Sequence, residues 1–109
     1  MGSRTYWELK QNNKSLFLYS HFGGESKHCD TRHALSMALP RLEQDDTAYA
    51  LRIVVCHLIG NYWADTTGYG LSLEDEFEEQ YEPCSIDLDN KTIIYGSSTL
   101  SIAQFVAVA

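Results

Sequence analysis

Histidine and cysteine are the residue types in this 109-residue sequence that could bind a metal or act as nucleophiles, and there are four histidines and three cysteines. His28, Cys29 and His33 could supply zinc ligands, but their spacing matches no structural zinc motif and no second cysteine pair follows. Cys29 or Cys84 beside a histidine could form a thiolate nucleophile, yet neither precedes a glycine turn that would build an oxyanion hole. We therefore predict no metal site, no cofactor and no catalytic residue, and an enzyme such as a hydrolase is the less favoured interpretation.

Residues 74–82 contain six carboxylates, and they are the first candidate binding surface. These are Glu74, Asp75, Glu76, Glu78, Glu79 and Glu82. Such a run is usually a solvated face. The functional interpretation is a surface that mimics nucleic-acid phosphates and occupies a basic groove on another protein, because opposite charges steer and hold such a pair.

The distribution of charge supports an acidic surface rather than a nucleic-acid-binding one. The net charge is -7, and residues 53–109 carry nine acids but only one basic residue, Lys91. Phosphate contacts need a basic face, so direct nucleic-acid binding is disfavoured.

A second candidate surface is a pocket for a small anionic ligand. It would combine two glycines of a loop that follows a strand, an arginine on a helix and polar residues of a later segment: His21, Gly23, Gly24, Arg52, Thr67 and Tyr69. Backbone amides and a guanidinium suit an anion such as a nucleotide. The glycines could instead form a simple corner, and Arg52 is equally suited to pairing with a structural carboxylate.

The element that must position these surfaces is a helix predicted over residues 45–61. Apolar residues recur at helical spacing along it, and Val54 and Leu58 lie one turn apart on its most apolar stripe. Asp45 or Asp46 can cap its amino end, and Gly60 can end it. This helix should be mostly buried, with Arg52 facing away from the core.

Around this helix we expect a single α+β domain over residues 1–109. Residues 2–4 resemble a cloning remnant, so residues 1–4 do not contribute to the fold prediction. The expected architecture is an antiparallel β-sheet packed against an antiparallel helix pair. Its first other elements are a hairpin over 6–20 and a helix over 31–43, which Asp30 caps and which Pro40 kinks or ends near Leu39. They are followed by a strand over 68–73, a helical turn or ordered loop over 74–82, a hairpin over 85–96 and a helix over 100–106.

Several segments of this chain together resemble a group of small bacteriophage proteins. The resemblance covers residues 15–106 and rests on LYSHFGG, PRLEQDD, YALRIVVCHLI, TGYGLS, SIDLD and QFV, with TGYG and LRI the most specific parts. The chain departs from the group's pattern at Phe22 and near Leu42, where tryptophan is expected, and at Pro40. The resemblance implies an α+β fold and a phage origin, and it carries no activity.

From the charge and the resemblance, we expect a phage-encoded inhibitor of a bacterial defence system or host enzyme, of anti-CRISPR type. It would act in the host cytoplasm on a host protein with a basic nucleic-acid-binding groove. The alternative is a sponge that sequesters a nucleotide immune signal. No apolar run of 18 residues is present, so we expect no membrane association, and a homodimer is the default expectation for a small chain.

Overall fold

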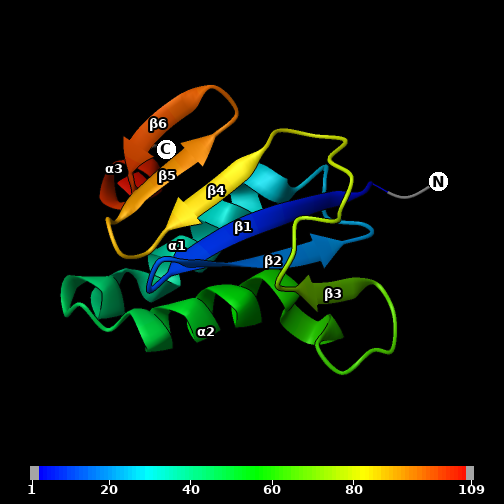
Figure 1. The fold of residues 1–109 in the computed structure, drawn as a ribbon, viewed down its shortest axis with the longest axis horizontal. Helices are drawn as coiled ribbons and strands as arrows, with labels where there is room; N and C mark the ends of the chain where they lie inside the picture. The colour runs from blue at the N-terminus through cyan, green and yellow to red at the C-terminus, as the bar shows by residue number, and fades with distance from the viewer. Residues whose placement is uncertain (1–2, 108–109) are drawn as a thin grey trace.

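Strands β1 (Thr5–Gln11) and β2 (Lys14–Ser20) form a hairpin inside a six-stranded sheet in the computed structural model, which describes residues 3–107 (Figure 1). Asn12 and Asn13 make the turn with φ of 55° and 63°, a left-handed conformation that asparagine tolerates and that tight hairpins require. Trp7 and Leu9 are buried on one face of β1 and Tyr6, Glu8 and Lys10 point to the other, as the alternation predicted.

The sheet is mixed and mostly antiparallel, with strand order β3-β2-β1-β4-β5-β6. The remaining strands are β3 (Tyr69–Ser72), β4 (Cys84–Asp87), β5 (Thr92–Tyr95) and β6 (Ser98–Ser101). The prediction of an antiparallel sheet is wrong for one pair, since β1 and β4 run parallel. The reason is the connection from β3 to β4: residues 73–83 carry the chain past β2 and β1 before the next strand begins (Figure 1).

The helices cover one face of this sheet, and the core lies between them and the strands (Figure 1). They are α1 (Lys27–Glu43), α2 (Thr47–Ile59), a short 3-10 helix η1 (Gly60–Tyr62) and α3 (Ile102–Ala107). Helices α1 and α2 contact each other, and α3 packs on α1 and on the β5–β6 hairpin. Within residues 3–107, no helix has both the length and the apolar character needed to cross a membrane.

Helix α2 is the predicted central helix, and its two ends are as expected. The Asp46 carboxylate accepts a hydrogen bond from the Tyr49 amide at 3.3 Å, and Gly60 follows the helix with φ of 62°. Val54 and Leu58 are buried as predicted. The helix is not mostly buried, however, because Ala48, Tyr49 and Arg52 are exposed on its outer side.

Helix α1 begins at Lys27, four residues before the predicted start, and continues through Pro40 to Glu43. Its buried stripe has helical spacing but opens with two polar residues: Lys27, Thr31, Ala34, Leu35, Ala38 and Leu42. Because the first turn buries the polar residues Lys27 and Thr31, the apolar spacing in the sequence did not predict this turn. Pro40 does not end the helix at Leu39; it lies exposed in the last turn, which buries Leu42 in the core.

The C-terminal segment differs from the predicted helix over 100–106. Residues 98–101 pair with β5 as strand β6, so the helix begins only at Ile102. Ser101 and Gln104 form a reciprocal cap, each side chain accepting a 3.0 Å bond from the other residue's amide. Ile102 and Phe105 then enter the core. The hairpin predicted over 85–96 is present as β4 and β5.

Candidate functional site

Residues 73–83, here called the acidic loop, lie over the sheet face opposite the helices (Figure 1). The segment is an ordered loop without a helical turn, the second of the two predicted forms. The Phe77 ring stacks on Tyr19 with centroids 4.9 Å apart and lies 6.2 Å from the Tyr6 ring. Phe77 therefore fixes the middle of the loop to side chains of β1 and β2.

Glu79 fixes the loop a second time, through both of its carboxylate oxygens. Oε1 accepts from Lys27 Nζ at 2.8 Å and from the Tyr6 amide at 3.3 Å. Oε2 accepts from the Thr5 hydroxyl and from the Tyr81 amide, the latter at 2.9 Å. The Glu79 side chain is only 13% exposed. It was predicted as part of the acidic face, but its side chain is largely buried and acts as a structural anchor.

Lys27, the partner of Glu79, is a fully enclosed lysine with 1% of its side chain exposed. Its Nζ also donates to the Glu82 carbonyl at 2.6 Å and lies 5.5 Å from the centre of the Trp7 ring. Trp7 in turn donates from Nε1 to the Thr31 hydroxyl at 2.8 Å. A lysine is rarely buried unless it is paired, so this residue ties α1, β1 and the acidic loop together.

The end of the acidic loop packs against the start of the chain and the glycine corner. Gln80 and Arg4 exchange two bonds, from Gln80 N to Arg4 O at 3.3 Å and from Arg4 N to Gln80 Oε1 at 3.2 Å. The Tyr81 ring lies so close to Gly24 that a Cβ there would overlap it. The group that approaches the backbone at this glycine is thus Tyr81 of the same chain.

The other five carboxylates of the predicted acidic face are exposed: Glu74, Asp75, Glu76, Glu78 and Glu82. None of them forms an ion pair within the described residues. Burial raises the pKa of the Tyr6 phenol, and the neighbouring Asp75 carboxylate raises it further. Five negative charges thus lie on a backbone that is held from beneath by Phe77 and Glu79.

The structure brings together only part of the predicted anion pocket. A pocket of about 310 Å³, here called the aromatic pocket, is lined by Phe22, Tyr62, Asp65, Thr67, Gly68 and Tyr69. His21 adjoins it, because its amide donates to Gly68 O at 2.8 Å and its ring contacts Phe22.

The two glycines and the arginine predicted for this pocket lie elsewhere. Gly23 and Gly24 are buried in their corner, and Arg52 is exposed on α2 without a carboxylate partner among residues 3–107. The one charged side chain in the lining is the Asp65 carboxylate, which disfavours an anionic ligand.

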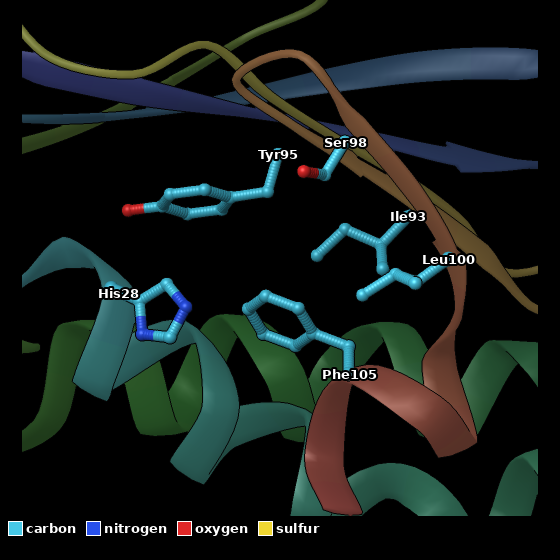
Figure 2. A pocket seen from close by; sticks show the side chains of 6 residues that line it. All are labelled: His28, Ile93, Tyr95, Ser98, Leu100 and Phe105. Atoms are coloured by element: carbon cyan, nitrogen blue, oxygen red, sulfur yellow. The ribbon is translucent and has the colours of Figure 1, made fainter. Parts of the chain in front are cut away.

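A smaller hollow of about 120 Å³ lies between α1, α3 and the β5–β6 hairpin (Figure 2). His28 and Phe105 form one wall, and Tyr95, Ser98, Ile93 and Leu100 form the other. The His28 ring meets Tyr95 edge to face at 5.0 Å, and burial raises the pKa of Tyr95 to about 12. Its aromatic contacts pack α3 against α1 and the β5–β6 hairpin.

Among the described residues, Cys84 is buried, and His28, His33 and His57 contact other aromatic rings. Burial raises the pKa of the Cys84 thiol to about 12, so this side chain is poorly suited to act as a thiolate nucleophile. His28 faces Tyr95, whereas His33 contacts His57 with ring centres 5.2 Å apart. Residues 3–107 contain no cluster of three or more histidine, cysteine or acidic side chains that could hold a metal.

Comparisons with known proteins give no further assignment. No protein-family model, no curated protein and no solved structure matches this chain. The acidic loop and the aromatic pocket are therefore the features of the molecule that bear on its function.

Proposed function

We propose that this protein acts by binding, and that it places the five exposed carboxylates of the acidic loop against a basic surface of a partner protein. One observation carries this proposal: the loop is anchored by Phe77 and Glu79, so its other acids are presented on a fixed backbone. A surface that is already ordered loses less conformational entropy on binding, and that raises affinity.

The partner that best fits five clustered carboxylates is a protein groove that otherwise binds nucleic-acid phosphates. Such a groove offers closely spaced Lys and Arg side chains, which gain long-range steering and ionic contacts from an acidic loop. Residues 53–109 contain a single basic residue, Lys91, that could repel such a partner. Lys91 is itself paired with Asp45 at 2.8 Å. Taken with the resemblance to phage proteins, this favours an inhibitor of a bacterial defence or host nucleic-acid enzyme, acting in the host cytoplasm.

The alternative role, a sponge for a nucleotide signal, has less support. The aromatic pocket is large enough for a small ligand, but its lining offers a carboxylate and no cation to a phosphate group. A panel of cyclic nucleotides should therefore leave the thermal unfolding temperature unchanged, since only a ligand that binds the native state raises it.

The test uses two charge-matched variants that both keep Glu79. One carries Glu74→Gln and Glu78→Gln in the acidic loop, and the control carries Glu43→Gln and Asp45→Asn, two exposed carboxylates where α1 ends and the turn to α2 begins. Each serves as bait in a bacterial lysate, with captured proteins identified by mass spectrometry and challenged with duplex DNA. We expect to identify a protein that is captured by the wild type and by the control but not by the loop variant. DNA should displace this protein from the bait. Equal capture by both variants, or capture that DNA leaves intact, would contradict the proposal.

A further inference from the structure

The aromatic pocket lies beside β3, an edge strand of the sheet. Three aromatic side chains from separate segments meet in its lining: Phe22 follows β2, Tyr62 ends η1 and Tyr69 starts β3. The Tyr62 and Tyr69 rings are nearly parallel, with an angle of 18° and centroids 6.3 Å apart. Phe22 and Tyr62 are 67% and 59% exposed, so much of this aromatic surface is uncovered.

The electrostatics of the pocket come from Asp65, the only charged side chain in the lining. Its carboxylate has no ion-pair partner in the described part of the chain. A bond from the Asp65 amide to Tyr62 O at 3.0 Å fixes the turn that holds the acid next to the Tyr62 ring. The whole chain adds a net charge of -7, which attracts cations and repels anions.

We propose that the aromatic pocket binds an alkylated ammonium group. Aromatic rings attract a cation through their π-electron faces, and three such rings, Phe22, Tyr62 and Tyr69, line this pocket. Their apolar surface also suits the alkyl groups, which shed water easily. The Asp65 carboxylate supplies a counter-charge within the same lining. An unalkylated ammonium is more strongly hydrated and gains less from such a site.

An adjoining hollow of about 180 Å³ indicates where the rest of the ligand extends. It shares Tyr62, Asp65 and Tyr69 with the aromatic pocket and adds Ile59, Trp63, Gly70 and Leu71. Its added side chains are apolar, so a ligand whose ammonium group carries an apolar chain can fill both spaces. Trp63 is 71% exposed while Trp7, the other tryptophan, is buried, so a change in exposed tryptophan fluorescence reports on this site.

An alkylated ammonium can come from a free small molecule or from a trimethylated lysine, and the experiment separates the two. The full chain is titrated with choline, with its neutral isostere 3,3-dimethyl-1-butanol, and with one peptide carrying trimethyllysine or unmodified lysine. Binding is measured by calorimetry and by Trp63 fluorescence. We expect at least one of the two cationic probes to bind and to exceed its own control, and the tighter of them identifies the source.

Variants then place the binding in the pocket. Phe22→Ala and Asp65→Asn alter exposed lining residues and should each weaken binding about three- to thirty-fold, the loss of a cation–π or charge contact. Tyr49→Ala, an exposed aromatic on α2 outside the lining, is the control and should bind as wild type does. Circular dichroism checks that each variant is folded. Absence of binding by both cationic probes, equal binding of the neutral isostere, or unchanged affinity in folded Phe22→Ala and Asp65→Asn would overturn the inference and would leave the acidic-loop proposal unaffected.

Discussion

The two faces of the sheet are covered in different ways. The helix face is closed by apolar side chains of α1, α2 and α3, whose stabilisation is spread over many residues. The opposite face carries the acidic loop, which is held mainly by one aromatic ring, Phe77, and one ion pair, Lys27–Glu79, with two further bonds between Gln80 and Arg4. Single substitutions on the helix face should therefore each remove a part of its stability. The attachment of the acidic loop depends instead on a few groups that cannot substitute for one another.

The largest expected effect is at the ion pair. Lys27→Met removes the cation and leaves the largely buried Glu79 carboxylate without its partner, which should lower the free energy of unfolding by about 3 to 5 kcal/mol. Guanidinium denaturation measures this change. The double variant Lys27→Met/Glu79→Gln is the control and should recover part of the loss, because no unpaired charge remains. A loss below about 1 kcal/mol in Lys27→Met would show that the pair does not anchor the loop.

A similar effect is expected on the helix face at Leu58, which is 5% exposed. Leu58→Ala leaves a void in the core and should cost about 2 to 5 kcal/mol in a denaturant titration. Arg52→Ala on the exposed side of the same helix should cost less than about 1 kcal/mol. If Leu58→Ala unfolds at the wild-type midpoint, α2 does not form the core.

A smaller and local effect is expected at Phe77, which is half-buried against Tyr19. Phe77→Ala removes one anchor and should cost about 1 to 2 kcal/mol, less than a fully buried ring would. Hydrogen exchange should accelerate in residues 73–83 and stay unchanged in α2. Faster exchange in α2 as well would mean that the two faces are not independent.

The smallest effect at neutral pH concerns Cys84. Burial raises the pKa of its thiol from 9.0 to about 12. The unfolded chain ionises this thiol near its ordinary value, so the contribution to stability is complete below pH 9 and is lost as pH rises toward 12. The free energy of unfolding should fall between pH 9 and pH 12, and Cys84→Ala should reduce that fall.

A thiol reagent at about pH 8 should modify exposed Cys29 well before Cys84. Equal rates for the two thiols in the folded protein would contradict the burial of Cys84.

The sequence predicted the helix face better than the opposite face, for a physical reason. Alternation in β1 and helical spacing in α2 are local patterns, and both place the correct residues, such as Trp7 and Val54, in the core. The parallel pairing of β1 with β4 depends on a long crossover, which no local pattern specifies. Strand β6 was missed because its serines and threonine also suit a helix cap.

The candidate sites were predictable in composition but not in detail. Six acids in nine residues mark the loop, yet nothing local separates Glu79 from its neighbours. The one available signal was Lys27, which continues the helical spacing of Thr31 and Leu35 and therefore faces the core. Likewise, Thr67 and Tyr69 were assigned to a pocket, but the contribution of Phe22 and Tyr62 depends on how separate loops meet in space.

Adjacent carboxylates give the most direct test of the central claim, that one acid anchors the loop while the others face a partner. The measurement is the free energy of unfolding of Glu79→Gln beside that of Glu78→Gln, two changes of identical chemistry one residue apart. Glu79→Gln weakens the bonds to Lys27, Tyr6, Thr5 and Tyr81 and should cost about 2 to 3 kcal/mol. Glu78→Gln, on the surface, should stay within about 0.5 kcal/mol of wild type. Equal effects of the two substitutions would contradict the claim.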